Sequence, residues 1–260
     1  MSVLTLRSVT FRRGERVILD SIDLDIESGG ITAVLGRNGA GKSTLLGCMA
    51  GLLEVASGQI ALNGESIATM PPRKRARHIA FLPQAPEIAW PIDVETLVRL
   101  GRIPFEGLIR DTDNDAAVAR AMQSTDVSQW ATRIVTTLSG GERARTQLAR
   151  IMAGESDWIL ADEPFTGLDP AHQFEAADLL RAFAARGGGV VLTIHDLALA
   201  AGIADRIVIL DHARVAADGT PQTALTPGIL RDIYDINAEW LMGDAGQARA
   251  FIAIHGKHVS

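Results

Sequence analysis

Cysteine and lysine are scarce in this chain of 260 residues, and long apolar runs are missing. The single cysteine, Cys48, excludes an internal disulfide framework and a zinc site built from cysteines, so we interpret it as a small buried hydrophobe. Apolar runs end well before the ~18 to 20 residues that cross a bilayer. Residues 1–7 lack a charged segment followed by a long apolar stretch, so we expect no secretion signal and a cytoplasmic location.

Positive charge is also in short supply. The net charge of −6 argues against general nucleic-acid binding, which needs a broad basic face, and we expect no nucleic acid among the partners. One basic cluster, Arg73, Lys74, Arg75 and Arg77, lies just before an apolar strand. Because the cluster is interrupted, we interpret it as a solvated helix face rather than a nucleic-acid patch.

The chain is long enough for one large α/β domain but short for two independent ones. Its periodicity indicates a strand-rich N-terminal part, a helical insert, and a part in which strands and helices alternate, as in a mostly parallel sheet. Strands are predicted over residues 3–9, 22–26, 31–35, 58–64, 78–82, 158–161, 190–194 and 206–210. Helices are predicted over residues 44–53, 94–100, 116–123, 142–153, 174–186 and 197–204, with short helices from residue 226 onward.

A glycine-rich segment follows a predicted strand and precedes a predicted helix, and it matches the P-loop pattern G-x-x-x-x-G-K-[ST]. Backbone N–H groups of such a loop curl around phosphate oxygens at the positive N-terminus of the helix. We expect Lys42 to reach the β and γ phosphates of ATP and Ser43 to bind Mg²⁺. An ordinary glycine turn would not need the whole pattern. The predicted ATP-binding residues here are Gly36, Arg37, Asn38, Gly39, Ala40, Gly41, Lys42, Ser43 and Thr44.

Two adjacent carboxylates, Asp162 and Glu163, end the apolar strand that begins at Trp158. Successive residues of an extended chain point in different directions, so the two can serve different purposes. We expect Asp162 to hold Mg²⁺ and Glu163 to orient and polarise the attacking water. An acidic pair at a strand end is by itself weak evidence, and the upstream P-loop strengthens it.

A third segment, Leu138-Ser139-Gly140-Gly141-Glu142, resembles the signature sequence of ABC ATPases. Gln84 after a strand, Gly167-Leu168-Asp169 after the carboxylates and His195 at a strand end follow in the order that this family uses. The resemblance covers about residues 3–220. It implies a P-loop NTPase (RecA-like) core with an N-terminal antiparallel β-subdomain and an inserted α-helical subdomain. Residues 1–225 would form the ATPase domain, with the insert at about 86–156, and residues 226–260 a short C-terminal extension.

The resemblance also implies a homodimer, because in ABC ATPases two domains meet head to tail around ATP. The signature residues Ser139, Gly140, Gly141 and Glu142 of one chain would then face the ATP on the P-loop of the other, again at a helix N-terminus. Asp169 would line the dimer seam.

Two more residues would act at the γ-phosphate of ATP. Gln84 would reach Mg²⁺ and water, and His195 would contact the γ-phosphate and hold Glu163 or the water. A histidine at a strand end is otherwise often a structural hydrogen-bonding residue.

Two positions depart from the family pattern. Glu142 stands where the common signature has Gln. This substitution puts a carboxylate close to the phosphates of the partner, and its effect stays open. Arg13 stands where many members stack an aromatic residue on adenine, with Phe11 two residues earlier. An arginine plane also stacks on a base, so we expect Arg13 to make the adenine contact.

The stretch Leu100-Gly101-Arg102-Ile103-Pro104 resembles ATPases that serve importers of iron-siderophore complexes, haem and cobalamin. The implied partners are membrane permease subunits and a periplasmic or extracellular substrate-binding protein, with this chain on the inner face of the cell membrane. Gly and Pro also start and stop helices anywhere, and this alternative stays open.

The alternative functions are a soluble ABC ATPase without a permease, an ABC subunit for another substrate, and a regulatory module that does not hydrolyse ATP. Soluble members usually carry two cores or a long coiled coil, and this chain has neither. A module without hydrolysis would lack Glu163 or Lys42, and both are present.

Overall fold

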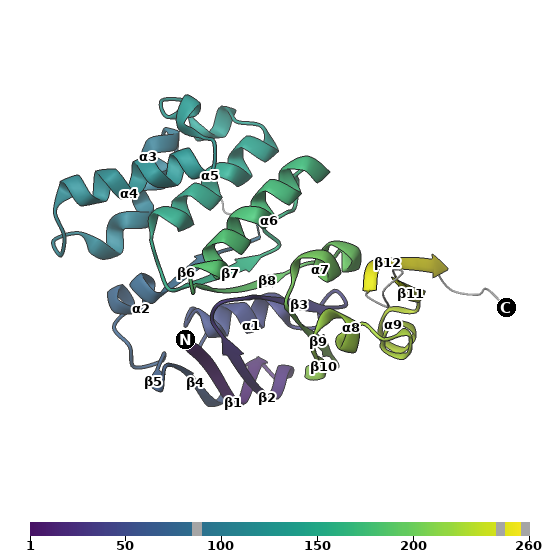
Figure 1. The fold of residues 1–260 in the computed structure, drawn as a ribbon. Coiled ribbons are helices and arrows are strands. Elements are labelled where there is room, and N and C mark those ends of the chain that lie inside the picture. The colour runs from purple at the N-terminus through teal and green to yellow at the C-terminus, as the bar shows by residue number, and fades with distance from the viewer. Residues whose placement is uncertain (85–89, 243–247, 256–260) are drawn as a thin grey trace.

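The computed structural model describes residues 1–84, 90–242 and 248–255. Within these residues the strands form a four-stranded sheet, a six-stranded sheet and a two-stranded hairpin. Figure 1 shows the six-stranded sheet at the centre, the four-stranded sheet below it and a layer of helices above it. The architecture confirms the predicted α/β class with an N-terminal antiparallel sheet.

The six-stranded sheet has the order β10-β9-β3-β8-β7-β6. All neighbouring strands run parallel except the β9–β10 pair at one edge. The central strands β3, β7 and β8 are buried along their whole length, which explains their nearly continuous apolar sequences. The bounds are β3 (Ile31–Gly36), β6 (Ile79–Leu82), β7 (Trp158–Asp162), β8 (Gly189–Thr193), β9 (Arg206–Asp211) and β10 (Arg214–Gly219).

The antiparallel sheet has the order β2-β1-β4-β5 and alternates buried and exposed residues, as a sheet with one solvated face does. Asn63 and Gly64 both have positive φ and make the predicted Asn-Gly turn between β4 and β5. The bounds are β1 (Val3–Arg13), β2 (Arg16–Glu27), β4 (Ser57–Leu62) and β5 (Glu65–Ser66).

Helix α1 (Lys42–Met49) lies between the two sheets. Its Leu45, Leu46 and Met49 share one apolar core with Leu4 and Leu6 of β1 and with residues of the large sheet. Since helix α1 is buried by a sheet on each side, the loop before it is held in a fixed position.

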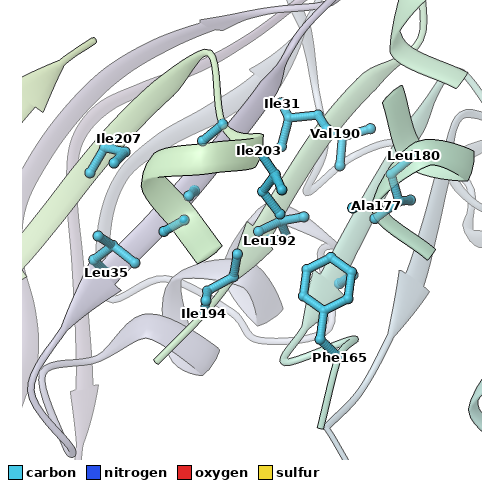
Figure 2. Packing of buried hydrophobic residues seen from close by; sticks show 14 of the residues in the cluster. Ile31, Leu35, Phe165, Ala177, Leu180, Val190, Leu192, Ile194, Ile203 and Ile207 are labelled. Carbon is cyan, nitrogen blue, oxygen red and sulfur yellow. The ribbon is translucent and has the colours of Figure 1, made fainter. Parts of the chain in front are cut away.

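The opposite face of the large sheet packs against α6 (Pro170–Ala185) and α7 (Leu197–Ile203). Figure 2 shows Ile203 of α7 beside Ile31 and Leu192 of the sheet, and Leu180 of α6 on the side of Val190. The helices predicted over 174–186 and 197–204 are therefore confirmed, with α6 beginning four residues earlier at Pro170.

The helices of the middle segment share a core of their own, drawn from α3, α4 and α5 and the turns between them. Gly101 lies so close to α5 that a Cβ there would be 2.1 Å from the carbonyl oxygen of Arg150. The buried Arg102 donates to Asn114 Oδ1 at 2.9 Å and to Ala153 O at 2.8 Å, which ties the helices together. Their bounds are α3 (Val94–Arg99), η1 (Leu100–Phe105), α4 (Asp111–Ser124), η2 (Ser128–Trp130), η3 (Val135–Thr137) and α5 (Gly140–Ala153).

Helix α2 (Pro72–His78) carries the basic cluster and buries none of its residues, so its interpretation as a solvated helix face is confirmed. Within the described residues, no helix combines the length and the hydrophobicity that crossing a bilayer requires.

The prediction of short helices after residue 226 is only partly right. Helix α8 (Pro221–Ala224) and helix α9 (Pro227–Tyr234) are followed by strands β11 (Asn237–Met242) and β12 (Ala248–His255), which pair as an antiparallel hairpin. The hairpin lies beside α9 and α7, and Leu230 and Ile233 of α9 join the main core. Packing against this core, rather than local periodicity, decides the conformation of these strands.

Burial makes Cys48 unreactive. Its side chain is 1% exposed, and loss of solvation raises the pKa of the thiol to about 12. At pH 8 only about one thiol in ten thousand would be ionised, against roughly a quarter for a free cysteine. We expect Ellman's reagent to modify the native chain at least about 100-fold more slowly than the chain in guanidinium. Equal rates in the two states would contradict this burial.

Candidate functional site

The predicted catalytic and phosphate-binding residues follow four neighbouring strands at their carboxyl ends. The P-loop follows β3, Asp162 and Glu163 lie at the end of β7, His195 follows β8 and Gln84 follows β6. Since β3, β8, β7 and β6 are adjacent and parallel, these ends share one edge of the sheet. In open α/β sheets ligands bind at this edge.

Two glycines of the P-loop are required by the backbone. Gly36 has φ 145°, and a Cβ there would lie 2.4 Å from the carbonyl oxygen of Leu210. Gly41 has φ 102°, and a Cβ there would lie 2.9 Å from the carbonyl oxygen of Ile18. These are conformations and contacts that only glycine accepts, so β9 and β2 shape the loop.

Lys42 is the first residue of α1 and is buried. Its ammonium donates to Gly36 O at 2.9 Å and to Arg37 O at 3.2 Å. Burial lowers the pKa of Lys42, and the negative charges of Glu163 and Asp162 oppose that shift. The structure therefore brings the P-loop cation near the carboxylate predicted to hold Mg²⁺, Asp162, and the one predicted to activate water, Glu163.

Asp162 and Glu163 are held by a residue that the motifs did not single out. The hydroxyl of Thr193 lies 2.6 Å from Asp162 Oδ1 and accepts the backbone N–H of Glu163 at 2.8 Å. Thr193 ends β8 opposite Asp162, and both side chains are buried. The only sequence signal that could have indicated Thr193 is a polar residue inside the apolar run 190–194.

The side chain of Glu163 contacts two partners. Its Oε1 lies in hydrogen-bond contact with His195 Nε2, and its Oε2 accepts the hydroxyl of Thr166 at 3.1 Å. Glu163 has φ 51°, a left-handed conformation that turns its chain out of the line of β7. The predicted pairing of Glu163 and His195 is thus present in the structure.

Ser43 and Gln84, predicted to bind Mg²⁺, are both exposed beside this edge of the sheet. Ser43 is the second residue of α1, and Gln84 lies two residues after the end of β6. Asp162 supplies the carboxylate between them in strand order. Residues 85–89, which follow Gln84, lie outside the described residues.

The signature residues begin helix α5, and Glu142 has a defined local role. Ser139 is the N-cap, with Ser139 N donating to Glu142 Oε2 at 2.7 Å and Glu142 N donating to Ser139 Oγ at 3.3 Å. Arg133 pairs with the other carboxylate oxygen at 3.1 Å. The backbone hydrogen bond from Ser139, followed by the contacts with its side chain and Arg133, lowers the pKa of Glu142. The Ser-x-x-Glu spacing from Ser139 to Glu142 is typical of a capping box and could have predicted this arrangement from the sequence.

Gly140 and Gly141 pack near the loop that carries Gly167, Leu168 and Asp169. Asp169 caps α6, because its Oδ1 accepts His172 N at 3.0 Å and its Oδ2 lies 2.8 Å from His172 Nδ1. The backbone bond from His172 is the main cause that lowers the pKa of Asp169.

A pocket of about 710 Å³ borders the P-loop on the side of the β1–β2 hairpin. Arg12, Arg16 and Ile18 line it together with P-loop residues 37–40. Arg13 ends β1, is exposed and pairs in register with Arg16. The hairpin that carries the predicted adenine contact therefore lies next to the P-loop, and the contact itself stays a prediction.

The C-terminal part of the chain also reaches the P-loop, which the motifs did not indicate. Tyr234 of α9 lines a pocket of about 380 Å³ with Gly36, Asn38 and His195. Asp235 lies 3.8 Å from the guanidinium of Arg37. Burial raises the pKa of the Tyr234 phenol. Only the folded chain brings residues 234 and 235 to a loop almost 200 positions earlier in the sequence.

The parallel sheet, the glycine-dependent loop before a buried helix and the acidic pair define a P-loop nucleotide-binding ATPase. The family model described as ABC transporter matches residues 19–166. The hemin import ATP-binding protein HmuV of Streptomyces coelicolor is 42% identical over 222 residues, which cover 85% of this chain and 79% of that protein. The protein of the same name from Pseudomonas entomophila is 41% identical over 241 residues, covering 90% and 93%.

Among solved structures, an inward-facing putative metal-chelate type ABC transporter superposes with a TM-score of 0.82 at 25% identity, covering 98% of each chain. An ATP binding subunit of an ABC transporter superposes with a TM-score of 0.75 at 26% identity, covering 88% of this chain and 92% of that one. The chain belongs to the ABC transporter family, as an ATP-binding and ATP-hydrolysing subunit.

Proposed function

We propose that this subunit powers the import of haem through a membrane permease. The observation that carries the proposal is the similarity to hemin import ATP-binding proteins, at 37–42% identity over 85–92% of this chain. Similarity to a putative metal-chelate type transporter favours an iron chelate as the second candidate substrate. A cobalamin-like cofactor is a third candidate substrate, supported only by the resemblance of residues 100–104 to importer ATPases.

Two residues of the stretch that resembles importer ATPases have packing roles in the structure. Gly101 is forced by the approach of α5, and the buried Arg102 links α4 and α5. These residues fix the geometry of the insert. Since these packing roles do not identify the substrate, it is inferred from the relatives.

Mg²⁺ is proposed as the metal that accompanies ATP. In the described residues no group of three His, Cys, Asp or Glu side chains could hold a metal, which argues against a cage made by the protein alone. A Mg²⁺ ion bound with phosphates needs only one or two carboxylates and other oxygen ligands. Ser43, Asp162 and Gln84 are oxygen donors that fit this requirement. When bound, Mg²⁺ would neutralise charge on the β and γ phosphates.

For hydrolysis we propose Glu163 as the residue that orients and polarises the attacking water. Contacts with His195 and Thr166 restrict the carboxylate, and the backbone of Glu163 is left-handed. His195 is about half exposed and contacts Glu163, and it would also contact the γ-phosphate. Gln84, at the end of the adjacent strand, would contact Mg²⁺ and the water. Residues 36–44 would bind the phosphates, and Arg13 the adenine.

The active assembly proposed is a head-to-tail homodimer. In it the N-terminus of α5, with Ser139, Gly140 and Gly141, would face the γ-phosphate on the partner. The capping box supports a modified view of Glu142, because its carboxylate is engaged by Ser139 N and Arg133 of its own chain. It would thus shape the signature turn rather than carry a free charge toward the phosphates. Asp169 would lie at the seam.

A docking surface for the permease is proposed on the helical insert. Exposed apolar side chains gather along residues 90–109: Trp90, Leu100, Ile103, Leu108 and Ile109. Exposed apolar residues concentrated in one region mark an interaction surface. Ile92 and Phe105 of the same segment are half-buried, and Phe105 packs under the guanidinium of Arg102. A permease at this surface would place the chain on the inner face of the membrane, with a substrate-binding protein on the other side.

The domain division proposed is an ATPase domain over 1–225, with the insert at about 86–156, and an extension over 226–260. The separate core of the insert supports treating it as a subdomain. Within the extension, residues 229–240 pack on the main core, and Asp235 reaches Arg37 of the P-loop.

Replacing Glu163 with Gln should lower steady-state ATP hydrolysis by about 100-fold or more while ATP binding persists, because only the general base is lost. Size-exclusion chromatography should show an ATP-dependent dimer. Lys42→Ala is the matched control for binding, and it should weaken ATP affinity itself. Hydrolysis by Glu163→Gln within about twofold of the parent would refute its proposed role.

The composite site can be tested by mixing two inactive chains. Ser139→Arg disables a signature and Lys42→Ala a P-loop, so a heterodimer of the two retains one intact site. ATP hydrolysis should recover partly in the mixture. If demonstrated heterodimers stay as inactive as the parents, either each chain acts alone or both sites are needed together.

Haem transport should be measured with the chain, its permease and the substrate-binding protein in proteoliposomes. We expect ATP-dependent uptake of haem in preference to ferric siderophores or cobalamin. Trp90 is 75% exposed on the proposed docking surface. Trp90→Asp should therefore abolish co-purification of the permease. Leu52→Asp changes an exposed apolar residue outside the insert and should leave docking intact. Uptake of another substrate class would overturn the haem proposal and leave the ATPase unaffected.

A further inference from the structure

A single buried hydroxyl connects the carboxylate of Asp162 to the backbone N–H of Glu163. Thr193 is fully buried at the end of β8, directly opposite Asp162 in the parallel register of β7 and β8. Its Oγ1 lies 2.6 Å from Asp162 Oδ1 and 2.8 Å from the backbone nitrogen of Glu163. Both partners belong to the neighbouring strand and its end.

The chemistry of the three groups sets the direction of these hydrogen bonds. A backbone N–H only donates, so the hydroxyl oxygen accepts the N–H of Glu163. The one hydroxyl hydrogen then goes to Asp162 Oδ1, which accepts it. The chain therefore runs from Glu163 N–H through Thr193 Oγ1 to Asp162 Oδ1. It directs one oxygen of Asp162 into the sheet and leaves Oδ2 for a ligand.

The second bond acts where the backbone is strained. Glu163 is a non-glycine residue with φ 51°, a conformation that persists when its surroundings hold it. The bond from its N–H to Thr193 is one such restraint, and the contacts of its carboxylate with His195 and Thr166 are the others. Loss of the hydroxyl would remove the restraint that lies nearest to the turned backbone.

We propose that Thr193 is a positioning residue that orients Asp162 toward the metal and Glu163 toward the attacking water. The inference rests on the roles proposed above for Asp162 and Glu163. Thr193 contacts neither ATP nor water in this scheme and acts through its two partners. Groups that orient metal ligands in this way typically contribute about 10- to 100-fold in metal affinity or activity.

The test is Thr193→Val, which keeps the shape of the side chain and removes the hydroxyl. We expect kcat for ATP hydrolysis to fall by about 10- to 100-fold. Affinity for ATP without divalent metal should stay within about twofold, since the P-loop is intact. Affinity for Mn²⁺ in the presence of ATP, measured by electron paramagnetic resonance, should fall by about tenfold. The metal measurement does not depend on turnover.

Two variants distinguish positioning from a general loss of structure. Thr193→Ser retains the hydroxyl and should restore kcat and Mn²⁺ affinity to within about threefold of the parent. Thr32→Val removes a buried hydroxyl from β3 near the amino-terminal end of the same sheet and should change neither. If Thr193→Val does not fold, Thr193→Ala is measured in the same way.

The outcomes separate this inference from the one it rests on. If Glu163→Gln still hydrolyses ATP, the proposed role of Glu163 fails, and the positioning role of Thr193 fails with it. If Glu163→Gln is inactive while Thr193→Val keeps normal kcat and Mn²⁺ affinity, only the inference about Thr193 is wrong. A Ser variant as impaired as the Val variant would also overturn it, because the hydroxyl would then not be the group that matters.

Discussion

The parallel pairing of β3, β8, β7 and β6 is the constraint on which the site depends. Each strand ends at the same edge of the sheet, so the P-loop, the acidic pair, His195 and Gln84 meet there although they span 160 positions of sequence. Register matters as much as order. Because Asp162 lies opposite Thr193, a shift of one residue between β7 and β8 would turn the Thr193 hydroxyl to the other face of the sheet.

The P-loop is fixed from several sides by parts of the chain that are far apart in sequence. β9 approaches Gly36, β2 approaches Gly41, and α1 is buried between two sheets. The C-terminal residues Tyr234 and Asp235 lie against the same loop. A loop held in this way loses little conformational freedom when it binds a ligand, which is the advantage of a preorganised anion site.

The helical insert has its own hydrophobic core, separate from the sheet edge that carries the site. It is tied together by Arg102 and by the close contact at Gly101, while apolar side chains such as Trp90 remain exposed. Its last helix begins with the signature turn, which the Ser139–Glu142 capping box closes. One compact unit therefore presents both the signature and the surface proposed for the permease, so a movement at one is able to reach the other.

Local patterns determined much of this protein. The P-loop could be predicted from the sequence alone, because its function depends on consecutive backbone N–H groups and one lysine. The buried strands were clear from uniform apolar runs, and the Asn63-Gly64 turn from its dipeptide. Strands β11 and β12 could not be predicted from the sequence, because packing on α7 and α9 decides their conformation. The roles of Thr193, Tyr234 and Glu142 depended on tertiary structure, or on a capping pattern hidden within the signature. A hydroxyl thirty-one residues from Asp162 becomes its partner only through strand register, and no local sequence property encodes that distance.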